Sequence, residues 1–302
     1  MEEWSLVMGG ADSVLGRRRK MKSQLSGKRT EVRIVRLILI AVVFLIFVFP
    51  DYWVIVTSLD APNQVMRVPP LLIPQGHWGN YSIAWRGAPW LRYFANTFFI
   101  AGLTTLLVLV TSVLAGFAFG VLRFRGRSFL FSVVLSMMMI PLAVLLVPDY
   151  IILKQLHWLN TYWAQIMPFG ASVFGIFLFR QFFMSFPLEL IDAAEIDGAS
   201  QWRFIWRVAV PMARPVLTTV AIFTFVASWD AFLWPYIMTS SPAVQPIEVG
   251  LAKFFGGAGV GTEWTVLAAA VMFTTLPIII LFLFMQRQFL AGASSTSAGI
   301  KG

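Results

Sequence analysis

The stretch from Phe94 to Leu122, FANTFFIAGLTTLLVLVTSVLAGFAFGVL, contains no charged residue. About 20 apolar residues in a helix cross the roughly 30 Å hydrocarbon core of a bilayer, so this stretch is long enough to span a membrane. The whole chain has the same character, because 58% of its 302 residues are hydrophobic and only 12% are charged. A soluble domain has too little interior to bury so much apolar surface, and we therefore expect a bilayer to be the solvent.

Other stretches of the chain repeat this pattern. The candidate spans are Leu37–Thr57, Phe94–Leu122, Ser128–Val147, Tyr162–Phe183, Pro215–Pro235 and Trp264–Phe284. The first is not expected to be a cleavable signal peptide, because its apolar run is too long and no small-residue cleavage site follows it. The sequence thus predicts an all-α polytopic membrane protein with six transmembrane helices, which crosses the cytoplasmic (inner) membrane several times.

The positions of Lys and Arg predict the orientation of these helices. With the N-terminus in the cytosol, most basic residues fall in cytosolic segments, as the positive-inside rule requires. The exceptions are Arg67, Arg86, Arg92, Lys154 and Lys253. Both termini are therefore predicted to be cytosolic. The formal net charge of +9 is explained by this topology, so we expect the lipid bilayer and no nucleic acid as a partner.

The predicted transmembrane domain covers residues 36–290. Residues 1–35 form a basic cytosolic tail, which is either a topology signal alone or a segment lying on anionic headgroups. Residues 291–302 form a cytosolic C-terminal tail. Between the third and fourth spans, residues 149–162 are too short and mixed to cross the membrane, and they predict an interfacial helix or a re-entrant connection.

Several spans contain residues that perturb helices. Either they serve close helix packing or they mark hinges, and the sequence leaves both open. These residues are Pro141, Pro168, Pro277, Gly116, Gly120 and Gly175.

The sequence contains no signature of catalysis or of a metal site. It has no Cys, and its two histidines, His77 and His157, lack a partner at metal-binding spacing. The glycine-rich run Gly256–Gly261 lacks the Lys-Ser/Thr pair of a phosphate-binding loop and is expected to be a flexible connection. We therefore expect no catalytic residues, no metal and no cofactor bound by this chain.

The longest charged interruption of the apolar pattern is PLELIDAAEIDGASQWRFIWRVAVP, residues 187–211. Pro187 is suited to the first turn of a helix, and Gly198 can adopt the left-handed conformation that ends it. Ser200 is a candidate N-cap for a second helix, which Pro211 is expected to terminate. The sequence predicts two short helices joined by a tight turn.

The second of these helices carries apolar residues at helical spacing. Their positions predict one exposed apolar stripe that needs a partner: lipid headgroups, other loops of the chain or a separate subunit. The stripe consists of Trp202, Ile205, Trp206 and Ala209.

The loop resembles the EAA loop of permease subunits of ATP-driven (ABC) importers. Asp192-Ala193-Ala194 stands for Glu-Ala-Ala, Asp197-Gly198-Ala199 matches fully, and Pro211 and Pro215 occupy the proline positions. Asp192 replaces Glu, Ile205 stands where Phe is usual, and Val210 replaces Leu. The stretches PDYWVIVTSL, NTFFIAG, VGLAKF and TEWTVLAAAVMFTTLPIIILFLFMQRQFLAG are similar to the second of the two permeases in carbohydrate importers of the maltose type.

The resemblance implies a type I ABC importer permease with a coupling loop, residues 185–212, between spans 4 and 5. It implies as partners a second, different permease subunit, two ATPase subunits that bind ATP and Mg, and an extracytoplasmic solute-binding protein. The implied contacts with an ATPase are Asp192, Ala193, Ala194, Asp197, Gly198, Ala199, Trp202, Ile205 and Pro211. The implied activity is import of a sugar or related polyol by alternating access.

A second group of residues is a candidate for the solute path. Asp230 is an ionisable residue within a predicted span, where such residues are costly and often functional. Trp229 and Trp234 flank it with flat apolar faces suited to a polyhydroxylated ligand, and Asn96 is a polar candidate in the second span. The alternative for Asp230 is a carboxylate that reaches to the outer interface without touching solute.

Two other functions remain open from the residues alone. A self-sufficient secondary carrier or channel is one, although the spans contain no chain of Asp, Glu, His and Lys that could carry protons. A membrane receptor or scaffold is the other, and it predicts no solute movement.

Overall fold

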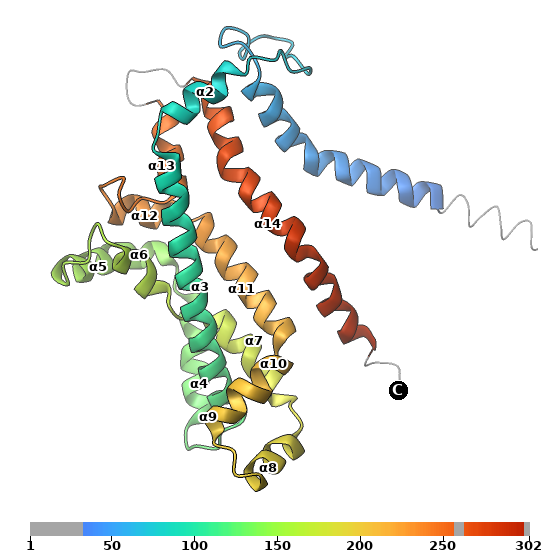
Figure 1. Ribbon diagram of the computed structural model, residues 1–302, viewed down its shortest axis with the longest axis vertical. Coiled ribbons are helices and arrows are strands. Elements are labelled where there is room, and N and C mark those ends of the chain that lie inside the picture. Colours follow the sequence, from blue (N-terminus) through green and yellow to red (C-terminus); the bar gives the residue numbers. More distant parts are fainter. Residues whose placement is uncertain (1–32, 257–262, 299–302) are drawn as a thin grey trace, which may run out of the picture.

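The computed structural model describes residues 33–256 and 263–298, and every regular element within these ranges is helical (Figure 1). Four helices are long and apolar enough to cross a bilayer: Arg33–Ser58, α3 (Trp90–Gly120), Tyr162–Met184 and Trp264–Leu281. Two bent helix pairs, within 127–155 and 201–229, bring the number of spans to six if each pair counts as one. The predicted all-α membrane fold is confirmed.

Shorter helices connect these spans or form parts of them: α6, η2 and α7 together make up Tyr162–Met184, and α14 contains Trp264–Leu281. Apart from the first span and α3, the elements in chain order are α2 (Gly79–Arg86), α4 (Arg127–Ser136), η1 (Met137–Met139), α5 (Leu142–Gln155), α6 (Tyr162–Ile166), η2 (Met167–Phe169), α7 (Val173–Met184), α8 (Leu188–Ile196), α9 (Gln201–Phe204), η3 (Ile205–Ala209), α10 (Val210–Met212), α11 (Arg214–Trp229), α12 (Leu233–Met238), α13 (Ile247–Leu251), η4 (Ala252–Phe254) and α14 (Trp264–Ala298).

Helix α3 is the centre of the bundle. It packs along α7 and α11, and the shared core contains Val108, Phe117, Phe179, Phe183 and Val220. These side chains recur on one face of each helix, so the contact is continuous from mid-helix to the end where α8 and α9 lie (Figure 1).

A second core lies at the opposite end of the bundle, around Trp90 and Tyr93 of α3. These rings pack with α13 and α14 through Ile247 and Ala269, and the Trp90 indole Nε1 donates to the carbonyl of Ala84, 2.8 Å away. Because the indole N–H is satisfied, the large ring can be buried at little polar cost. This core fixes α2, α13 and α14 against the start of α3.

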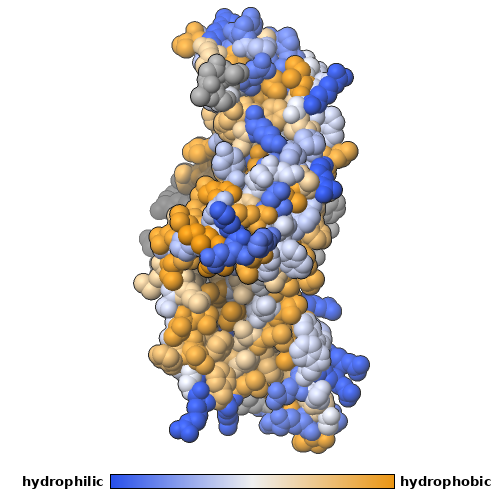
Figure 2. All heavy atoms as spheres, turned by 90° about the vertical axis from the view of Figure 1, so that its left-hand side faces the viewer, coloured by the Kyte–Doolittle hydropathy of each residue, from blue (hydrophilic) through white to orange (hydrophobic). Residues whose placement is uncertain are grey.

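The N-terminal helix Arg33–Ser58 stands apart from the bundle along most of its length (Figure 1), and none of its most apolar window is buried. Its end is held by Asn80, whose Nδ2 donates to the carbonyls of Ser58 and Asp60, both at 2.9 Å. The free apolar surface is typical of a lipid-facing helix. Figure 2 shows a broad apolar surface on another face of the molecule, with hydrophilic residues at both ends and a hydrophilic patch between them.

The third span differs from the prediction. The sequence predicted one helix over Ser128–Val147, whereas the chain bends by 98° between Met139 and Leu142. Pro141 lies at this bend in an extended conformation, ψ 133°. A proline has no N–H to continue the helical ladder, so the helix ends before it. Helix α5 therefore includes residues 149–155, the first half of the segment that was predicted as an interfacial or re-entrant connection.

The fifth span is also interrupted, because α11 ends at Trp229 and α12 begins at Leu233. At the C-terminal end, α14 continues to Ala298, beyond the predicted end of the sixth span at Phe284. The basic tail of residues 1–35 lies outside the described residues except for its last three positions, as does the glycine-rich run except for Gly256.

Candidate functional site

The loop between α7 and α11 has the two-helix form that the sequence predicted. Helix α8 ends before Gly198, which adopts the left-handed conformation with φ +68°. The hydroxyl of Ser200 then caps α9 by accepting from the backbone N–H of Arg203, 3.3 Å away. The tight turn at Gly198 and the cap at Ser200 are therefore confirmed.

Pro211 does not end the second helix, contrary to the prediction. A π-helical turn, η3, precedes it, in which the N–H of Val210 bonds the carbonyl of Ile205 five residues back. The chain stays helical through Met212, and α11 then starts at an angle of 81°. A π turn is wider than an α turn and lets the chain pass the proline ring, so the bend falls after Pro211 instead of at it.

The predicted apolar stripe is divided between surface and core. Trp202 is 60% exposed, whereas Ile205 and Ala209 are buried at 6% and 0%. Phe204, next to the stripe, is also buried, and its ring packs against Phe117 of α3. The prediction that the whole stripe is exposed is wrong because the bundle itself covers most of it.

The exposed part of the loop combines apolar and acidic groups. Trp202 and Ile196 are 60% and 86% exposed, and the carboxylates of Asp192 and Asp197 are exposed as well. This surface offers apolar anchors with acidic groups around them, a pattern suited to a protein partner.

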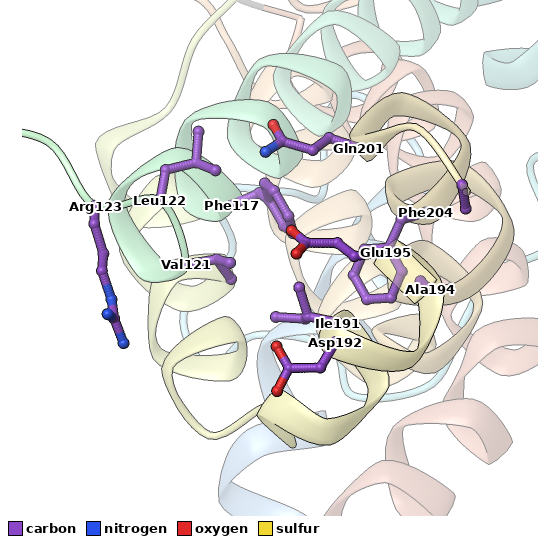
Figure 3. A pocket seen from close by; sticks show the side chains of 11 residues that line it. Phe117, Val121, Leu122, Arg123, Ile191, Asp192, Ala194, Glu195, Gln201 and Phe204 are labelled. Atoms are coloured by element: carbon purple, nitrogen blue, oxygen red, sulfur yellow. The ribbon is translucent and has the colours of Figure 1, made fainter. Parts of the chain in front are cut away.

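Beside the contact of Phe204 with Phe117, a cleft of about 340 Å³ lies between the loop and the end of α3 (Figure 3). Glu195 and Gln201 from the loop line it, together with Phe117 and Arg123 from the other side. Of the motif residues, Asp192, Ala194 and Ala199 also line this cleft, while Ala193, Asp197 and Gly198 are exposed on the loop. Asp192 both lines this cleft and is exposed, so the motif spans the cleft and the outer surface of the loop.

The residues proposed for the solute path are not gathered in one place. Asn96 is 1% exposed, and its Nδ2 donates to the carbonyl of Gln245 (2.8 Å) while its Oδ1 accepts from the hydroxyl of Tyr162 (2.7 Å). Trp229 is also 1% exposed and packs edge-on against Phe98 at 4.9 Å between centroids. Both side chains are committed to internal contacts, so neither presents a free face here.

Trp234 does line a cavity, the larger of the two described here. It holds about 590 Å³ and lies between α3, α7, α11 and α12. The indole Nε1 of Trp234 donates to the carbonyl of Ala164 (2.9 Å), and its ring meets Phe169 edge-on at 5.0 Å. The volume is within the roughly 300–1,000 Å³ typical of small-molecule sites. Asp230, by contrast, is exposed at the end of α11, and Ala231 follows it on the cavity wall.

Two interruptions of the spans meet at this cavity. One interruption is residues 170–172, between η2 and α7, and the other is residues 230–232, between α11 and α12. In each of them the last two residues line the cavity and the first is next to the wall in sequence. Non-helical backbone at membrane depth is tolerated where protein buries it or where it lines a cavity that water can enter. The breaks therefore place backbone polar groups next to the cavity.

Sequence reasoning missed Glu248, an acidic residue on α13. Burial and the nearby charge of Asp230 raise the pKa of Glu248 to about 7. It was missed because α13 is too short to give a periodic signal, and only the folded chain brings it near Asp230. Among the described residues, no group of three or more His, Asp or Glu could hold a metal ion.

Comparisons of the sequence with family models and with curated proteins agree on one family. Residues 112–293 match the model of the family described as binding-protein-dependent transport system inner membrane component. The sn-glycerol-3-phosphate transport system permease protein UgpE of Yersinia enterocolitica is 33% identical over 82% of this chain and 91% of its own length. The arabinooligosaccharides transport system permease protein AraQ of Bacillus subtilis is 30% identical over 85% and 92%.

A solved structure has the same fold. It belongs to a bacterial ABC transporter involved in the import of the acidic polysaccharide alginate, and it matches with a TM-score of 0.74 at 22% identity over 85% of this chain and 95% of that one. A structure of a bacterial alginate ABC transporter in complex with an alginate pentasaccharide-bound periplasmic protein matches with a TM-score of 0.61 at 17% identity, over 86% and 96%. The chain is a multi-pass membrane transport subunit and belongs to the family of binding-protein-dependent transport system inner membrane components.

Proposed function

We propose that this chain is one of two different permease subunits of an ATP-driven importer for a sugar or related polyol. The observation that carries the proposal is a packed connection between the loop and the cavity. Phe204 and Ile205 of the loop share one core with Phe117 on α3 and Phe183 on α7. The same two helices, with α11, line the cavity. A displacement of the loop therefore moves the cavity walls, because a packed core transmits displacement.

The partner at the loop is an ATPase subunit. Trp202 and Ile196 supply apolar anchors for a groove on that subunit, while Asp192 and Asp197 meet polar or basic groups at its rim. ATP and Mg bind to the ATPases, and this chain binds no cofactor and catalyses no reaction. The loop and both termini then lie in the cytosol, as the distribution of Lys and Arg favours.

The remaining partners are a second permease and an extracytoplasmic solute-binding protein. The similarity to a transporter solved with its periplasmic protein supports the latter. A second permease would complete the wall of the solute path that this chain provides on one side. The conformational cycle is alternating access, with the solute path opened to one side of the membrane at a time.

The test is transport by the assembled importer in vesicles. The complex of both permeases and the ATPases is reconstituted, and radiolabelled solute is supplied with the binding protein outside the vesicle. We expect uptake only when ATP is present on the ATPase side and the binding protein is present on the other. Uptake by this chain alone, driven by an ion gradient, would indicate a secondary carrier. Absence of solute movement under every condition would indicate a receptor or scaffold.

A further inference from the structure

The cavity between α3, α7, α11 and α12 combines aromatic surface with neutral polar groups. Phe169, Phe174, Phe232 and Trp234 contribute rings to its wall. The polar side chains on the wall are Thr104, Gln165, Ser172, Thr224 and Ser228. Aromatic rings cover the C–H faces of a saccharide, and hydroxyl and amide groups bond its hydroxyls.

Two of these polar side chains have an atom without a partner. Thr104 and Gln165 are each 3% exposed, and neither the Oγ1 of Thr104 nor the Oε1 of Gln165 makes a hydrogen bond. Gln165 is oriented by its Nε2, which donates to the carbonyl of Val244 at 2.9 Å. A buried polar atom without a partner costs about 1–3 kcal/mol, so these atoms favour a ligand that can bond them when the cavity opens.

The cavity wall formed by the described residues has no charged side chain. Arg92 is held elsewhere, where its Nε donates to the carbonyl of Ala243 at 2.8 Å. A phosphate or uronate in this cavity would find no counter-charge on the wall that the described residues form, and desolvating such an anion is costly.

Two helix ends of opposite polarity border the cavity. The N-terminus of α7, which favours negative charge, lies at the cavity through Ser172 and Phe174, and the hydroxyl of Ser172 accepts there from the N–H of Gly175. The C-terminal end of α11, which disfavours negative charge, borders the cavity through Ser228. A neutral hydroxyl can accept from the first end and donate to the second.

We propose that this cavity is a solute-binding site of this chain and that it accepts an uncharged saccharide in preference to a phosphorylated polyol or a uronate. The proposal rests on the proposed import function and narrows its substrate class. The proposed substrate differs in charge from those named for two of the similar transporters, because glycerol phosphate and alginate are anions.

The first experiment uses the complete importer in vesicles with its own binding protein and ATP. The probes are arabinotriose, maltotriose and glycerol for the neutral class, and glycerol 3-phosphate and alginate trisaccharide for the anionic class. We expect uptake from the neutral class only. Uptake of an anionic probe at an equal or higher rate contradicts this inference alone, whereas no ATP-dependent uptake of any probe contradicts the proposed function itself.

The second experiment locates the site with two matched variants on α3. Thr104→Val removes the buried hydroxyl of a residue that lines the cavity, and Thr105→Val removes a neighbouring buried hydroxyl that also lacks a partner, from a residue that does not line it. We expect Thr104→Val to lower uptake of the neutral solute by about 3- to 10-fold, the value of one hydrogen bond, with normal assembly of the complex. Thr105→Val is expected to leave uptake unchanged. Equal uptake by the two variants would show that the cavity does not bind the solute.

Discussion

Gly116 of α3 lies directly against Phe179 of α7. A Cβ added to Gly116 would overlap the Cβ of Phe179 and lie 3.0 Å from the backbone nitrogen of Arg180. One turn later, a Cβ on Gly120 would lie 2.8 Å from the Cβ of Phe183. The two glycines bring α3 and α7 into close contact, which is how small residues act at helix interfaces in membranes.

Gly116→Ala is therefore expected to destabilise the protein. The added methyl group must separate two backbones, and such overpacking costs about 1–3 kcal/mol. The measurement is the thermal unfolding midpoint of the purified protein in detergent. The matched control is Gly102→Ala on the same helix, where an added Cβ has no atom within 4 Å. Equal midpoints for the two variants would contradict the close contact.

Gly198→Val is expected to uncouple transport from ATP hydrolysis or to weaken assembly with the ATPases. Space is not the reason, because an added Cβ would meet nothing within 4 Å. The reason is the φ of +68°, which costs an ordinary residue about 1–2 kcal/mol and a β-branched residue more. The measurements are uptake and ATPase association. Gly198→Asn is the control, since Asn tolerates this conformation, and normal uptake by Gly198→Val would contradict the prediction.

Trp202 and Phe204 are expected to have separable roles although they lie two residues apart. Trp202→Ala should weaken ATPase binding and leave thermal stability almost unchanged, because the ring is 60% exposed. Phe204→Ala should lower stability by about 3–5 kcal/mol, because the ring is buried against the bundle. Binding is measured by co-purification and stability by thermal unfolding. A large loss of stability in Trp202→Ala would place that ring in the core instead.

Glu248 makes the stability of the protein depend on pH. Its pKa is raised from 4.5 to about 7 by burial and by Asp230, so the folded protein retains this proton to higher pH than the unfolded chain does. The contribution of Glu248 to stability is then greatest below about pH 4.5, is lost as the pH rises from 4.5 through 7, and is constant above that.

Glu248→Gln removes this dependence, because the amide has no charge to bury. We expect the variant to match the wild type near pH 4.5 and to exceed it at pH 8 by on the order of 1–2 kcal/mol, a value reduced for the partial exposure of the group. Thermal unfolding at both pH values measures it. Asp230→Asn should give part of the same gain. An equal difference at the two pH values would mean that Glu248 titrates normally.

Asn80→Ala is expected to release the end of the N-terminal helix. It removes the donor to two carbonyls, those of Ser58 and Asp60, and a lost buried hydrogen bond costs about 1–3 kcal/mol. Faster hydrogen exchange in residues 56–67 would report the release. Asn63→Ala, at an exposed position, is the control, and it should leave exchange unchanged.

Patterns along the sequence predicted several local features correctly, although not the helix end at Pro211. The apolar runs, the turn at Gly198 and the cap at Ser200 depend on residues a few positions apart, and each is found in the structure. The span boundaries were less predictable. Hydropathy averaged over a span did not place the bend at Pro141 or the end of α11 at Trp229, although Pro141 was a candidate hinge and Asp230 directly follows Trp229.

For the candidate sites as well, local patterns suggested residues, and tertiary packing decided which of them are exposed or line a cavity. Helical spacing placed Trp202 and Ile205 on one stripe, yet only packing decides which of them the bundle covers. Residue type favoured Asn96, Trp229, Asp230 and Trp234 for the solute path, and only Trp234 lines the cavity. Their role in transport stays a prediction.

The sequence by itself determined that this is an all-α protein of the membrane with a loop of two short helices. Hydropathy, glycine conformation and helix capping act over a few neighbouring residues, so they can be recognised in the sequence. The tertiary structure alone decided which apolar residues are exposed, where the spans break and which polar atoms meet at a cavity. These depend on contacts between residues far apart in the chain, such as Gly116 with Phe179 and Phe117 with Phe204, and no local pattern contains them.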